Sequence, residues 1–72
     1  MTTGERLYKL RKQSGLMLEK ISEILEISYQ AYRKYEKDFC YPSVENLIKL
    51  TKMYNTTADY ILCLSDNDNR SH

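Results

Sequence analysis

The chain has 72 residues, of which 42% are hydrophobic and 29% are charged, and its formal net charge is +1. This length provides for a single small domain, and the composition is typical of globular proteins and excludes collagen-like and extensively disordered chains. No apolar run approaches the roughly 20 residues of a membrane-spanning helix, and no apolar stretch follows the N-terminal charges as it does in a signal peptide. We therefore expect a cytoplasmic protein.

Charge is distributed unevenly along the sequence. Residues 1–37 carry eight Lys or Arg and five Glu, a balance of +3, whereas residues 38–72 carry three basic and five acidic residues, a balance of −2. A basic first half permits nucleic-acid binding, but a solvated helix surface has the same composition. Charge alone therefore does not decide the function.

The first predicted helix covers residues 3–14. Thr2 and Glu5 have the spacing of a capping box at its start, and Gly15 stands where a left-handed residue ends a helix. Apolar residues at helical spacing face inward, and the basic residues between them face water. The inward residues are Leu7 and Leu10, and the outward residues are Arg6, Lys9 and Lys12.

Two short helices follow, over residues 18–25 and about 29–37. Ser28 is a good N-cap for the second of them, and Ile27 and Tyr32 occupy the positions of a hydrophobic staple that fixes its entry angle. The first of them has one apolar stripe, which predicts a core-facing side. The stripe consists of Leu18, Ile21, Ile24 and Leu25.

A loop over residues 38–42 leads to a fourth predicted helix, about 44–54, and a fifth, about 58–64. The polar residues 66–72 predict a disordered tail, so that residues 1–65 form the domain. In the fourth helix the side chains expected to face inward are Val44, Leu47, Ile48 and Thr51.

The predicted third helix has two chemically different faces. Tyr32 and Tyr35 fall on one side, where core residues are expected. Its other side is rich in hydrogen-bond donors and positive charge, and Tyr29 lies on the flank. Two short helices joined by a tight turn suggest a helix-turn-helix, although a small helical bundle with a solvated face has the same pattern. The polar side consists of Gln30, Arg33, Lys34 and Lys37.

Four segments, in order and at the right spacing, resemble the phage-repressor/Cro-like helix-turn-helix family, also called the XRE family. The resemblance covers about residues 3–64 and implies a compact, all-α, five-helix lambda-repressor-like bundle whose third helix enters the DNA major groove. It also implies a sequence-specific transcriptional regulator of bacterial or phage type, in the simplest case a repressor, that binds double-stranded operator DNA. The segments are GERLYKLRKQSGL, I-S-x-x-x-Y-x-x-Y-E from Ile27 to Glu36, YPSVENLIKL and ADYIL.

The resemblance also implies roles for individual residues. The base-facing positions of the family match side chains whose chemistry suits the role, because Gln pairs with adenine and Arg or Lys with guanine. Two further lysines are placed for phosphates, which position a domain without reading sequence. The matching positions of an ion pair that links the third helix to the first are Arg11 and Glu36. The base-facing residues are Tyr29, Gln30, Arg33 and Lys34, and the phosphate-binding residues are Lys20 and Lys37.

The chain departs from the family pattern at several positions. Met17 and Leu18 replace a polar cap and a phosphate-binding Gln, and Glu26 replaces the Gly of the turn. Asp38 and Phe39 stand where the family commonly has Asn-Gly and basic residues. The apolar Leu18 and Phe39 leave a second interpretation open. On that interpretation the same fold is a protein-interaction module, antitoxin-like or anti-repressor, with weak or no DNA binding.

The fifth predicted helix suggests a homodimer. Five large side chains follow one another over residues 60–64, and a short helix cannot turn all of them toward one core. An exposed apolar patch of this kind favours association. A two-fold dimer would place two recognition helices roughly 34 Å apart, one DNA turn. The expected interface residues are Ile61, Leu62 and Leu64.

Catalytic and metal-binding patterns are missing from the sequence. Cys40 and Cys63 do not form a Cys-x-x-Cys pair, and His72 is the only histidine. A zinc site needs about four such ligands at close spacing, and a hydrolytic site needs a nucleophile beside a general base. The sequence therefore predicts no metal, no cofactor, no small-molecule ligand and no enzyme activity.

Overall fold

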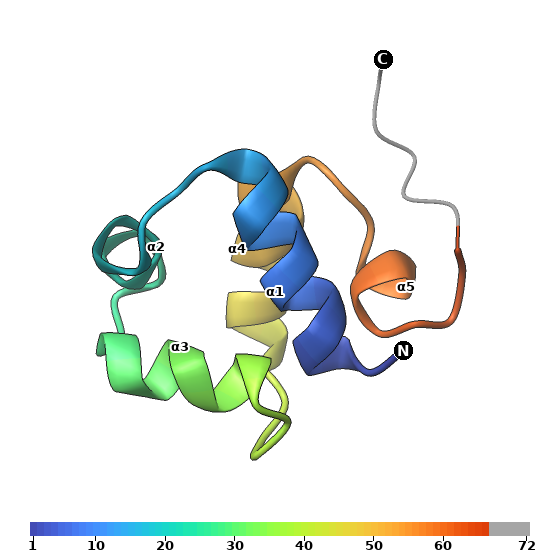
Figure 1. Cartoon of the computed structure of the whole chain (residues 1–72), viewed down its shortest axis with the longest axis horizontal. Helices are drawn as coiled ribbons and strands as arrows, with labels where there is room; N and C mark the ends of the chain where they lie inside the picture. The colour runs from blue at the N-terminus through green and yellow to red at the C-terminus, as the bar shows by residue number, and fades with distance from the viewer. Residues whose placement is uncertain (67–72) are drawn as a thin grey trace.

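The computed structural model describes residues 1–66, and this part of the chain forms five α-helices and no strand. Helices α1 and α4 lie at the centre, α2 and α3 lie to one side of them, and α5 lies to the other (Figure 1). The prediction of an all-α, five-helix bundle is therefore confirmed. The bounds are α1 Thr3–Ser14, α2 Leu18–Leu25, α3 Tyr29–Glu36, α4 Val44–Tyr54 and α5 Ala58–Ile61.

Most helix ends agree with the prediction, and the clear exception is the end of α5. This helix stops at Ile61 instead of about residue 64, and Cys63 takes a left-handed backbone conformation with φ of 63°. Helix α3 ends at Glu36, one residue earlier than predicted. Apart from Asp66, the tail predicted for residues 66–72 lies outside the described residues.

Apart from the start of α2, the helix N-termini are capped by the side chains that the sequence indicates. The Thr2 hydroxyl accepts from the Glu5 N–H at 3.1 Å, and the Thr2 N–H donates to the Glu5 carboxylate at 2.9 Å, a complete capping box. Gly15 and Asn55 end α1 and α4 in the left-handed region, with φ of 74° and 53°. Each N-cap satisfies an otherwise unpaired N–H and contributes about 1 kcal/mol. The N-caps of α3, α4 and α5 are Ser28, Ser43 and Thr57.

All five helices contribute apolar side chains to one core. Tyr32 also brings a hydroxyl into it, and this group forms a hydrogen bond of 2.7 Å with the Tyr54 hydroxyl. Burial raises the pKa of both phenols, that of Tyr54 to about 12, so both rings stay neutral. The hydroxyls of Tyr32 and Tyr54 are thus each other's hydrogen-bond partners in the core, as buried polar groups require. The most completely buried side chains are Leu7, Leu10, Ile21, Leu25, Tyr32, Leu50 and Ile61.

Helix α4 turns a different face inward from the one predicted. Val44 and Ile48 are 75% and 49% exposed, so the prediction that they face the core is wrong. Leu50 and Tyr54 fill the core instead, and Leu47 packs against it. The apolar residues of α4 form two overlapping stripes in the sequence. Contacts with α1, α2 and α5 select one of them.

Arg6 is buried, which corrects the prediction that it faces water. Its guanidinium donates to the carbonyl oxygens of Tyr60 and Ser65, at 3.0 and 3.1 Å, and lies 4.0 Å from the centre of the Tyr60 ring. A buried charge needs such partners, and the guanidinium provides several donors in one plane. Arg6 thereby links α1 to α5 and to the segment that follows it.

The burial of Ile61 corrects part of the predicted dimer interface. Its side chain is inaccessible and belongs to the core, so it cannot contact a second molecule in this conformation. Leu62 is half-buried, and Leu64, which follows the end of α5, is 74% exposed. Only these two residues of the predicted set offer apolar surface.

No helix within residues 1–66 is both long and apolar enough to cross a membrane.

Candidate nucleic-acid interface

Helices α2 and α3 form a helix-turn-helix, joined by residues 26–28. Glu26 adopts the left-handed conformation, with φ of 59° and ψ of 40°, although it is not a glycine. Its N–H donates to the Glu23 carbonyl at 3.2 Å, and the Ile27 N–H donates to the Ser22 carbonyl at 3.1 Å. A non-glycine residue in this conformation costs roughly 1 kcal/mol. The turn therefore keeps its geometry and carries modest strain.

The start of α2 lacks the polar group that the family pattern has there. Met17 is the N-cap residue, makes no side-chain capping hydrogen bond and is 69% exposed. Leu18 is half-buried and packs against the core, beside the buried Ile21 and Leu25, whereas Ile24 is 38% exposed. Leu18 therefore presents only part of its side chain to a protein partner.

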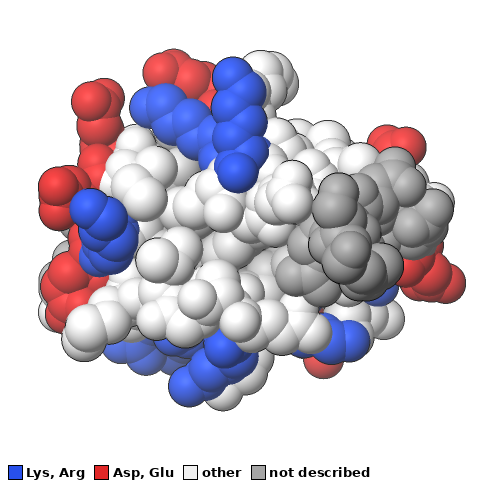
Figure 2. All heavy atoms as spheres, turned by 90° about the horizontal axis from the view of Figure 1, so that it is seen from above, with Lys and Arg blue, Asp and Glu red and all other residues white. Residues whose placement is uncertain are grey.

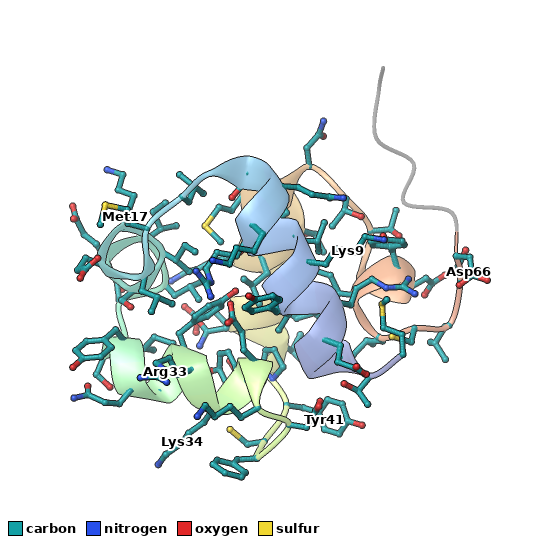
Figure 3. All side chains as sticks on the ribbon, in the orientation of Figure 1. Lys9, Met17, Arg33, Lys34, Tyr41 and Asp66 are labelled. Atoms are coloured by element: carbon teal, nitrogen blue, oxygen red, sulfur yellow. The ribbon has the colours of Figure 1, made fainter. Side chains whose placement is uncertain are left out.

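Helix α3 is fixed by one face and presents the other to solvent. Tyr32 is fully buried and Tyr35 is 8% exposed, and their rings pack edge to face with centroids 6.1 Å apart. Through this buried side, α3 packs against α1 and α2. Arg33 and Lys34 project from α3, and Lys34 points away from the body of the molecule (Figure 3). The exposed side chains of α3 and its C-cap are Tyr29, Gln30, Arg33, Lys34 and Lys37.

The structure brings most of the predicted DNA-contacting residues together around one groove. This groove has a volume of about 210 Å³ and lies along the exposed side of α3. Tyr29 lies outside it, although it is exposed on the same helix, and Lys20 is exposed on α2. A larger hollow of about 440 Å³ between α1 and α3 shares Arg33 and Lys37. The smaller groove is lined by Gln30, Arg33, Lys34, Lys37 and Phe39.

The acidic side chains gather elsewhere. Figure 2 shows the face that is at the top of Figure 1, which lies on the side away from α3. Uncharged atoms cover the middle of this face, and acidic side chains lie at the end where α2 lies and also at the opposite end. Helix α2 carries the exposed Glu19 and Glu23, and Glu26 follows it. A polyanion would therefore be attracted to the outer side of α3 and repelled at the far side of α2.

Arg11 and Glu36 form the ion pair predicted between α1 and α3. The Glu36 carboxylate accepts from the Arg11 Nε at 2.7 Å and from its Nη2 at 3.1 Å, so the pair is bidentate. The two side chains are 15% and 7% exposed. The hydrogen bond to Glu36 raises the pKa of Arg11 above its ordinary value, so the guanidinium stays charged. The pair fixes the C-terminal end of α3 to α1.

Asp38 makes a second connection between α3 and α1, which the sequence analysis does not predict. Its carboxylate accepts from the Thr2 hydroxyl at 2.6 Å and from the Gly4 N–H at 2.8 Å, at the N-terminus of α1. A negative charge is favourable at that position because the free N–H groups and the helix dipole are positive there. Asp38, which lies in the stretch where the family commonly has Asn-Gly and basic residues, therefore has a structural role.

Gly4 makes this close approach possible. An added Cβ at this position would lie 2.4 Å from the Glu36 carbonyl oxygen and 2.7 Å from the Tyr35 carbonyl oxygen. Only a glycine fits between α1 and the last turn of α3. A signal was present in the sequence, because a glycine in the first turn of a helix is unfavourable unless packing requires it.

Sites of other kinds are not formed by the described residues. Within residues 1–66, no group of three or more His, Cys, Asp or Glu side chains is placed to hold a metal ion. Cys40 is a free, exposed thiol in the loop after α3, and Cys63 is a free, half-buried thiol.

The sequence is similar to those of bacterial transcriptional regulators. It is 34% identical over 62 residues to the HTH-type transcriptional regulator ImmR of Bacillus subtilis. The aligned region covers 86% of this chain and 49% of that protein. It is 32% identical over 78 aligned positions to the HTH-type transcriptional activator BcrR of Enterococcus faecalis. The aligned region covers 100% of this chain and 38% of that protein. The chain thus spans half or less of these relatives.

The fold is similar to that of a solved repressor. The P22 c2 repressor in complex with a synthetic operator superposes with a TM-score of 0.81 and 27% identity, over 86% of this chain and 94% of that one. The DNA-binding domain of the P22 c2 repressor in solution gives a TM-score of 0.79 and 28% identity, over 93% and 91%. A family model described as a helix-turn-helix domain matches residues 4–66. The chain therefore belongs to the helix-turn-helix domain family, in its phage-repressor/Cro-like branch.

Proposed function

We propose that this chain is a sequence-specific DNA-binding transcriptional regulator of repressor type, which acts in the cytoplasm by occupying operator DNA. The observation that carries the proposal is the exposed face of α3, where Gln30, Arg33 and Lys34 surround one groove while the opposite face is held in the core. The similarity to a repressor solved with an operator supports it. Such a protein acts by binding and needs no catalytic group.

The chemistry of each side chain indicates whether it contacts a base or a phosphate. Gln30 pairs with adenine N6 and N7, and Arg33 and Lys34 pair with guanine O6 and N7. Tyr29, which is 45% exposed, donates its hydroxyl to a phosphate or places the face of its ring against a thymine methyl. Lys20 and Lys37 bind phosphates and set the register of the domain on the duplex.

Substitutions of Arg33 and Lys37 will separate base reading from phosphate binding. On duplexes selected by the wild type from a random pool, Arg33→Ala should cost about 1–3 kcal/mol of binding free energy and relax preference at one position. Lys37→Ala should weaken binding to every sequence alike and reduce the slope of log affinity against log salt by about one. Fluorescence anisotropy titrations at several salt concentrations measure both effects. Equal, sequence-independent losses in the two variants would remove Arg33 as a base reader.

A second candidate function is favoured by exposed apolar side chains in the loop after α3 and on α4. A protein-interaction module, antitoxin-like or anti-repressor, would use such a surface, as large exposed apolar patches commonly do. Half-burial of Leu18 weakens this candidate, because part of its side chain packs against the core. A module of this kind would bind mixed genomic DNA weakly at both low and moderate salt. The exposed residues are Phe39, Tyr41, Val44 and Ile48.

We also propose that two copies pair through the end of α5. The exposed Leu64 and the half-buried Leu62 supply apolar surface there, and two-fold pairing would suit successive major grooves. Sedimentation without DNA should show a dimer for the wild type at micromolar concentration, and Leu64→Glu should be monomeric because a charge cannot be buried in that contact. A monomeric wild type, or a fully dimeric variant, would place the interface elsewhere.

A further inference from the structure

Phe39 is an exposed aromatic side chain at the edge of the cationic face of α3. It is 74% exposed, and it lines the 210 Å³ groove together with Gln30, Arg33, Lys34 and Lys37. An apolar ring gains free energy when a partner covers it, because burial removes its surface from water. The other four side chains of the groove are hydrogen-bond donors suited to DNA. Phe39 is the apolar component of the same groove.

The backbone of Phe39 is fixed relative to α3. Its N–H donates to the Lys34 carbonyl at 2.9 Å, and the Asp38 N–H donates to the Tyr35 carbonyl at 3.2 Å. Asp38 lies in the left-handed region with φ of 63°, and its carboxylate is held by Thr2 and the Gly4 N–H. The backbone is therefore anchored on the N-terminal side of the ring. Little backbone entropy is lost when a side chain on a fixed backbone binds.

We propose that Phe39 forms a subsite for the 5-methyl group of thymine in the major groove. The inference rests on the proposed function and deepens it. The thymine methyl is the apolar group that base edges offer in this groove, and it lies opposite the adenine atoms that a glutamine reads. Gln30 and Phe39 line one groove, so an A·T pair offers both side chains a partner. Lys37, which is assigned to a phosphate, lines the same groove, so a backbone contact is expected beside such a base pair.

Replacement of single thymines by deoxyuridine tests the subsite, because it removes only the methyl group. On a duplex selected by the wild type, one such replacement should weaken wild-type binding about fourfold, the expected effect of one buried methyl. Phe39→Ala should weaken binding to the thymine duplex by at least the same factor and should show no difference between the two duplexes. Phe39→Leu, which keeps an apolar side chain, should retain part of the difference.

Tyr41→Ala is the matched control. Tyr41 belongs to the same loop and is 73% exposed, but it does not line the groove and lies well away from Lys34 (Figure 3). This variant should keep the full thymine preference. Far-UV circular dichroism and the melting temperature should be unchanged in Phe39→Ala, since an exposed side chain contributes little to folding.

Two results would overturn the inference while the proposed function stands. In one, Phe39→Ala binds the selected duplex as the wild type does. In the other, Phe39→Ala binds more weakly than the wild type but still binds the thymine duplex more tightly than the deoxyuridine duplex. The ring of Phe39 would then contact a deoxyribose and not the thymine methyl. Failure of the wild type to select any duplex would instead remove the proposed function, and the subsite with it.

Discussion

Gly4→Ala will destabilise the protein by about 2–4 kcal/mol, although alanine is normally the better helix former by roughly 1 kcal/mol. The sign is reversed because the added Cβ would lie 2.4 and 2.7 Å from the carbonyl oxygens of Glu36 and Tyr35. Backbone oxygens cannot rotate away, so α1 and the end of α3 must separate. Urea unfolding followed by circular dichroism measures the change in the free energy of unfolding.

Gly15→Ala is the control for Gly4→Ala. No atom lies within 4 Å of a Cβ built on Gly15, and its positive φ of 74° is the only obstacle. We expect a cost of about 1 kcal/mol from the backbone conformation alone. If Gly4→Ala were neutral or stabilising, the tight contact between α1 and α3 would not exist in solution.

Removal of the Glu36 charge has the second large expected effect. Glu36→Gln leaves Arg11 charged in a site where the two side chains are only 15% and 7% exposed. Breaking a buried pair in this way costs roughly 3–5 kcal/mol, because one charge remains without its partner. The melting temperature and the free energy of unfolding should both fall, and the loss should be smaller in the double variant Arg11→Gln/Glu36→Gln.

An exposed pair on α4 provides the comparison. Lys49 lies 3.6 Å from Glu45, whose side chain is 80% exposed. Glu45→Gln should therefore change stability by less than about 1 kcal/mol. An unchanged melting temperature in Glu36→Gln would show that the Arg11–Glu36 pair makes no net contribution to the fold.

Local signals in the sequence predicted most of the fold. Caps such as Thr2, Ser28 and Gly15 act on their own helix, so the sequence was sufficient to place the helix ends that they form. Arg6 and Ile61 were predicted wrongly, because their burial depends on contacts between α1 and α5. Residues far apart in the sequence form those contacts, and helical periodicity does not contain them.

In the candidate site too, features set by local sequence were predicted and features set by long-range contacts were not. The polar face of α3 follows from periodicity, and the residues around the groove include Gln30, Arg33 and Lys34, as predicted. Asp38 was predicted only as a departure from the family pattern. Its role as a link to α1 depends on the loop passing close to the start of α1. Its partner Gly4 is 34 positions away in the sequence. Family resemblance did not reveal that link, because Asp38 departs from the family pattern.

The central claim is that α3 reads DNA sequence, and a comparison of two duplexes tests it most directly. The wild type is titrated with its selected duplex and with a scrambled duplex of equal length and composition, at low and moderate salt. We expect the selected duplex to bind at least about a thousandfold more tightly, with both affinities falling steeply as salt rises. Equal and weak binding of the two duplexes at both salt concentrations would contradict the claim.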